Sequence, residues 1–152
     1  MKHSGSIVLI FSFLPAICGL ALAHSGATGI VKERMDLMKS IAGHMKTIGK
    51  MIKGESDYDA DKVVVAARII ADHAEEVPDM FPEGSIEDPS KAVPEIWRDW
   101  EAFIELSADL GKHAIKLSNV ADDAVDVSGI RQQFSAVGKT CSACHEDFRA
   151  NQ

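Results

Sequence analysis

Apolar residues recur at alternating steps of four and three through most of the chain, and this spacing restricts the fold more than any other feature. A step of three or four places side chains on one face of an α-helix, whereas a half-buried strand shows apolar residues at every second position. No stretch of the sequence alternates in that second way. The sequence therefore predicts an all-α protein.

Four segments carry this period, and residues that commonly end helices separate them. They run from about 29 to 53, from 56 or 57 to 77, from 92 to 117, and from 121–123 to about 149. Gly54 and Pro78 follow the first two segments, and Pro94 lies in the first turn of the third. Residues 78–91 have three prolines and no period, which predicts a long loop. These segments predict an antiparallel up-down-up-down four-helix bundle, whose first and fourth helices are neighbours.

We expect the apolar stripe of each helix to face the bundle interior. The stripe of the first helix consists of Val31, Met35, Met38, Ala42, Met45, Gly49 and Ile52. That of the fourth consists of Val127, Ile130, Phe134, Val137, Cys141, Cys144 and Phe148. Most of these residues are interpreted as core packing, and the two cysteines are the exception.

The first 23 residues are predicted to form a secretory signal peptide. Lys2 precedes an apolar run that ends in Ala21-Leu22-Ala23, a small-x-small cleavage pattern. The run is short for a membrane span, so we expect cleavage after Ala23, with an uncleaved anchor as the alternative. The mature chain, 24–152, would then be a single domain in the periplasm, without a membrane span.

The charge of the chain restricts its partners. Its formal net charge is −7, and removal of Lys2 leaves 15 basic against 23 acidic residues, or −8. Such a surface disfavours nucleic acid and anionic lipid. A partner attracted by charge would have to present a basic patch.

One motif carries chemistry. Cys141, Cys144 and His145 form a C-x-x-C-H sequence, which is the attachment site of c-type haem. Cysteines three positions apart share a helical face, so both sulfurs can bond to the vinyl groups of one porphyrin. The histidine that follows can then bind the iron as the proximal ligand. We therefore predict one covalent haem c.

Two other sites use similar residues, and both fit less well. A structural zinc site requires four ligands, but the mature chain has no other cysteine and its histidines are scattered. A thioredoxin-type cysteine pair would require strands in a βαβ unit. A haem-free helical binding module, with an accidental motif, is the remaining alternative.

With its motif in the last of four helices, the mature chain resembles the class II cytochrome c family, the cytochromes c-prime and their low-spin relatives. Members of this family typically have an arginine on the first helix, and a leucine or methionine four residues later faces the iron. Arg34 and Met38 match this pattern. Arg34, one turn before Met38, is placed to pair with a haem propionate, and the alternative is an ordinary solvated arginine. A basic residue four positions after the ligating histidine is also frequent in the family, and Arg149 fills that position, where it could lie beside the proximal pocket or fray with the terminus.

The order of the helices allows Met38 to reach the iron from the distal side. The start of the first helix should lie beside the end of the fourth. At ~1.5 Å of rise per residue, Met38 and His145 then both lie within about 15 Å of one end of the bundle. Met35 is one turn nearer that end and is the first alternative, whereas Met45 lies ~10 Å farther along. A methionine on such a stripe can also be a packing residue only.

These features predict an electron-transfer protein and not an enzyme. With His145 and Met38 as ligands, the protein would carry one electron by Fe(III)/Fe(II) cycling and exchange it with a periplasmic redox partner. If Met38 only packs over the iron, the family resemblance implies a five-coordinate cytochrome that binds nitric oxide or carbon monoxide. The resemblance is compatible with a monomer or a homodimer.

Overall fold

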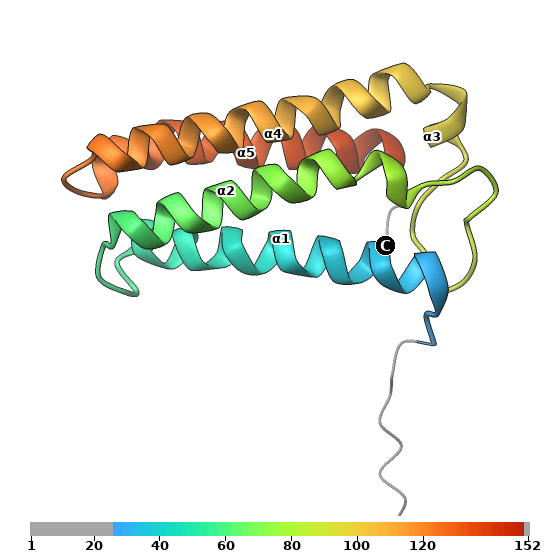
Figure 1. Cartoon of the computed structure of the whole chain (residues 1–152), viewed down its shortest axis with the longest axis horizontal. Coiled ribbons are helices and arrows are strands. Elements are labelled where there is room, and N and C mark those ends of the chain that lie inside the picture. The colour runs from blue at the N-terminus through green and yellow to red at the C-terminus, as the bar shows by residue number, and fades with distance from the viewer. Residues whose placement is uncertain (1–25, 151–152) are drawn as a thin grey trace, which may run out of the picture.

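The computed structural model describes residues 26–150, which form helices joined by loops. The elements are α1 (Gly29–Lys53), α2 (Ala60–Glu76), the 3-10 helix η1 (Pro78–Met80), α3 (Glu95–Arg98), α4 (Trp100–Asp123) and α5 (Val127–Phe148). The four long helices lie side by side as an antiparallel bundle (Figure 1). Within the described part of the chain there is no strand, only an isolated bridge between Ala92 and Arg149. The predicted fold class is therefore confirmed.

Two expectations concern the N-terminal region and the membrane. The predicted signal peptide, 1–23, and the cleavage site after Ala23 lie outside the described residues. Across residues 26–150, no helix combines the length and the apolar character needed to span a bilayer.

The ends of the helices have local causes. Gly54 adopts a left-handed conformation, with φ of 75°, and its N–H donates to the last carbonyls of α1. Asp59 accepts a hydrogen bond from the backbone N–H of Lys62 and so caps α2. Because of this cap, α2 begins at Ala60 and not at the predicted residue 56 or 57.

The predicted boundaries of the last two helices were wrong. The third helix does not run unbroken from residue 92, because the chain leaves the helical conformation at Asp99. The Asp99 side chain accepts from the N–H of Ala102 and starts α4 at Trp100. The fourth helix begins at Val127 and not at 121–123, because α4 continues to Asp123 and Asp126 caps α5.

Helices α2 and α4 pack closely along their length because small residues line their contact. A Cβ atom on Gly111 would lie 3.7 Å from the Cβ of Ala74, which is ordinary contact distance. The Ser107 hydroxyl donates to the carbonyl of Ala74 over 2.7 Å, so this buried polar group is satisfied. Helices α1 and α5 are neighbours too, but they touch at few positions.

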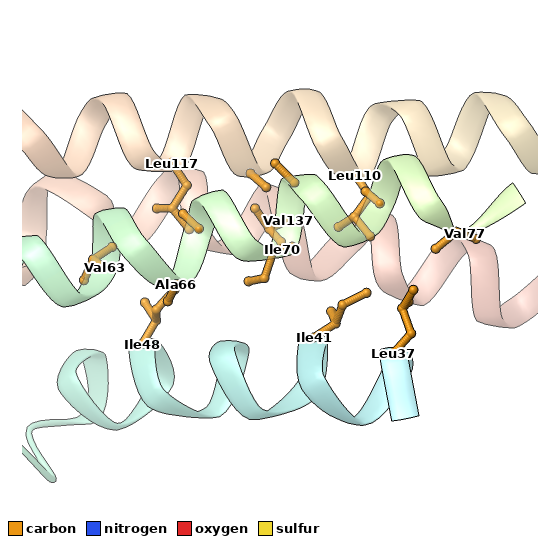
Figure 2. Packing of buried hydrophobic residues seen from close by; sticks show 14 of the residues in the cluster. Leu37, Ile41, Ile48, Val63, Ala66, Ile70, Val77, Leu110, Leu117 and Val137 are labelled. Atoms are coloured by element: carbon orange, nitrogen blue, oxygen red, sulfur yellow. The ribbon is translucent and has the colours of Figure 1, made fainter. Parts of the chain in front are cut away.

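The core face of α1 differs from the predicted stripe. Leu37, Ile41 and Ile48 are buried and point toward α2 (Figure 2). The predicted Met38 is only half-buried, and Ala42 is exposed. The apolar surface of α1 is wider than one stripe, so one part packs on α2 and the other faces the space beside α5.

Replacing Ile70 tests the contribution of this core. Its side chain is fully buried, so Ile70→Ala should lower the free energy of unfolding by about 2–5 kcal/mol in guanidinium titrations of the purified protein. Val65→Ala on the same helix is the control, because Val65 is 56% exposed and should change that free energy by less than about 0.5 kcal/mol. Equal losses in both variants would contradict this description of the core.

Candidate functional site

Two cavities lie where α1 and α5 face each other. The first has a volume of about 360 Å³ and extends to the loop after η1. The second has a volume of about 320 Å³ and lies deeper, between α1, α4 and α5. Met38, Val77, Cys144 and His145 line both of them. Each volume is in the range of known ligand sites.

The structure brings the predicted site residues together. Arg34, Met38, Cys144, His145 and Arg149 line the first cavity. Cys141 lines the second cavity together with Met38, Cys144 and His145. The alternative methionines are also close, because Met35 lines the first cavity and Met45 the second. The bonds that these residues form with a haem stay predictions.

Helix α5 presents its two cysteines on one half-buried face. Both are free thiols that pack against the hydrophobic core. Burial raises the pKa of Cys141, and burial together with the nearby charges of Cys141 and Asp147 raises the pKa of Cys144 to about 11. Before a haem is attached, the polypeptide therefore holds two protonated thiols on one apolar wall at neutral pH.

His145 follows at the edge of both cavities. Desolvation by the surrounding protein lowers the pKa of His145, and the positive charge of Arg149 lowers it further. The imidazole is therefore neutral at pH 7, which is the form that binds a metal ion.

These features fit a haem group. The walls are mostly apolar, as a porphyrin requires, and two thiols and a neutral imidazole lie on one side. Met38 lies on the other side, on α1, and supplies a thioether sulfur. For the zinc alternative, residues 26–150 contain no group of three or more His, Cys, Asp or Glu side chains that could hold a metal ion.

Arg34 is buried and holds the loop that closes the first cavity. Its side chain is 5% exposed, and its Nε and Nη2 donate to the carbonyl of Met80 over 3.1 and 2.9 Å. Nη2 also donates to the backbone and hydroxyl oxygens of Ser85, and Nη1 donates to the Ser90 hydroxyl over 3.1 Å. The guanidinium lies 3.9 Å from the centre of the Phe81 ring. Its predicted contact with a propionate is not tested by these bonds.

Sequence reasoning missed how the loop reaches the site. The N–H of Val93 donates to the carbonyl of Phe148, and the N–H of Ala150 donates to the carbonyl of Lys91 over 2.8 Å. These bonds join the loop to the C-terminal end of α5 and bring Lys91 to the first cavity. Residues 78–91 have no period, so the sequence carries no signal for this pairing.

Comparisons with known proteins agree with this geometry. Residues 29–149 match the family described as Cytochrome C'. Cytochrome c-556 of Agrobacterium tumefaciens is 36% identical over 121 residues, which cover 80% of this chain and 97% of the relative. Cytochrome c' of Halomonas halodenitrificans is 33% identical over 125 residues, covering 79% and 95% of the two chains.

Solved structures of similar proteins have the same fold. Cytochrome c' from Rhodopseudomonas palustris has a TM-score of 0.76 and 29% identity, covering 83% of this chain and 99% of that one. A nitric oxide complex of a mutant cytochrome c prime from Alcaligenes xylosoxidans has a TM-score of 0.71 and 29% identity, covering 80% and 94%.

Substituting Arg34 tests whether this residue holds the loop. Arg34→Lys keeps the charge but loses the planar fork that reaches Met80, Ser85 and Ser90. Hydrogen bonds from a charged group contribute about 1.5–3 kcal/mol, so amide exchange in residues 80–92 should accelerate at least ~10-fold. Arg98→Lys is the control, because Arg98 is exposed and pairs only with Glu95 among the described residues. Unchanged exchange in Arg34→Lys would show that the loop does not need this residue.

Proposed function

Because the chain belongs to the cytochrome c' family, we propose that it is a periplasmic carrier of single electrons. Proteins of this family bind one covalent haem c, and Cys141 and Cys144 fit its C-x-x-C-H attachment motif. Haem c supplies Fe(III)/Fe(II) chemistry. The chain is thus a haem c cytochrome, and the proposal concerns what it does with that haem.

The proposal rests on one observation, the position of Met38 opposite His145. The two residues come from different helices and line the same two cavities. In the proposed arrangement, Cys141 and Cys144 hold the haem through thioether bonds and His145 provides the proximal ligand. Met38 would provide the distal ligand, so that the protein would supply two ligands to the iron.

The bundle is suited to electron transfer for two reasons. With both axial positions occupied, the protein leaves no open position for a substrate, so no substrate-converting residue is proposed. The closely packed α2 and α4 give a rigid frame, which limits rearrangement when the charge of the iron changes. The first cavity lies at the end of the bundle where the loop after η1 meets α5.

Gas binding is the second candidate function. Met38 lies beside apolar space in both cavities, so it could pack over the iron without bonding to it. The nitric oxide complex of the Alcaligenes relative favours this function for that protein. In this chain a five-coordinate site would bind nitric oxide or carbon monoxide on the Met38 side, and Arg149 would lie near the proximal side.

The cellular setting is part of the same proposal. Covalent haem attachment takes place outside the cytoplasm, and the predicted signal peptide would direct the chain to the periplasm. The net charge of −7 favours a redox partner with a basic patch. The chain would act as a monomer or a homodimer.

Replacing Met38 distinguishes the two candidates. The oxidised wild-type protein should have a low-spin optical spectrum with a Met–Fe(III) charge-transfer band, and Met38→Ala should turn it into a high-spin spectrum. Met45→Ala is the matched control from the same helix and should stay low-spin, as should Met35→Ala. A high-spin wild-type spectrum would favour gas binding, and an unaltered spectrum in Met38→Ala would exclude this residue as the ligand.

Covalent attachment is tested by removing the thiols. In a host that matures c-type cytochromes, the double variant Cys141→Ser/Cys144→Ser should lose haem staining on denaturing gels, and its mass should equal that of the bare polypeptide. Ser142→Ala is the control, because Ser142 lies between the cysteines but is exposed. A double variant that still stains would disprove the assignment of the attachment residues.

A further inference from the structure

The lining of the first cavity carries positive charge in an acidic protein. Arg34, Lys91 and Arg149 line this cavity, and none of its lining residues is an aspartate or a glutamate. The chain as a whole has a net charge of −7. Three cations without an acid in the lining of a mostly apolar cavity favour a ligand that has an apolar body and an anionic end.

Arg34 has few free hydrogen-bond donors for such an anionic end. Four of its five N–H groups point at loop oxygens, and one hydrogen of Nη1 is left without an acceptor among the described residues. The guanidinium also has no carboxylate partner within residues 26–150. Arg34 therefore uses four of its five N–H groups to hold the loop.

Lys91 is held at the cavity by its backbone, and its side chain is available. Its carbonyl accepts from the N–H of Ala150, and the preceding Ser90 accepts from Arg34 and from the N–H of Ala92. The residue is exposed, and its ammonium forms no ion pair with any residue in the described range. Hydrogen bonds thus fix the main chain around Lys91, while its ammonium group has no partner in the described range.

We propose that Lys91 binds a propionate of the haem and that Arg34 positions it by holding the loop. Haem carries two propionate carboxylates, which the apolar walls of the cavities cannot satisfy. Arg34 has one N–H left for them, so the remaining charge must come from Lys91 and Arg149 in the same cavity lining. This inference depends on haem binding, which both candidate functions share, and not on whether Met38 bonds to the iron.

The pH dependence of the reduction potential tests this role. Spectroelectrochemical titration of the holoprotein from pH 5 to 9 should show a potential that falls as a propionate ionises, because a negative charge stabilises Fe(III). A cation beside the propionate lowers the propionate pKa. In Lys91→Gln that pKa should rise, so the fall in potential should move to higher pH by about half to one pH unit. The backbone bond to Ala150 remains in this variant.

Two further variants make the result decisive. Lys91→Arg keeps the charge and should retain the wild-type profile. Lys39→Gln removes the same charge next to Met38, but Lys39 is exposed and does not line the cavity, so its profile should stay near that of the wild type. A Lys91→Gln profile that superimposes on the wild type, or an equal displacement in Lys39→Gln, would overturn the proposal. The spin state of each variant, recorded in parallel, reports separately on the axial ligands.

Discussion

The unequal packing of the four helices determines where in the bundle there is room for a ligand. Small residues such as Ala74 and Gly111 bring α2 and α4 into close contact, and the buried serine between them has its hydrogen bond. Helices α1 and α5 flank this pair but touch each other at few positions. A uniformly packed bundle would have no room between its helices. Here α2 and α4 supply the rigidity, and α1 and α5 supply facing walls of the site.

Helices α1 and α5 give those walls different chemistry. Before a haem is attached, the wall from α5 has two neutral thiols and a neutral imidazole, because burial and neighbouring charges shift their pKa values in the directions that favour the uncharged forms. The wall from α1 has the half-buried thioether of Met38. The charged lining residues belong to the first cavity, where α1, the loop and the end of α5 contribute cations, and the second cavity has none. The site therefore passes from a first cavity with charged lining residues to a second cavity without them.

Local signals in the sequence predicted much of this structure. Gly54 marks the end of α1, and the spacing of Cys141 and Cys144 places both on one helical face whatever the rest of the chain does. Features that depend on contacts far apart in sequence were not predictable. The stripe around Met38 was taken for the core, because a wide apolar face does not reveal which part meets α2. Asp99 interrupts a helix without interrupting the apolar period, so the sequence pattern does not show the break. The position of Lys91 depends on backbone hydrogen bonds between the loop and residues 148–150.

The pairing of the loop with the last described residues has a consequence for the order of assembly. The cavity is closed by α1, the first of the described helices along the sequence, and by residues up to Ala150, at the other end of the described range. A chain made from its N-terminus can bury Leu37 and Ile41 against α2 before residues 141–150 are present. The two walls of the site therefore meet only after α5 has been made, and a chain that ended before α5 would lack one wall of both cavities.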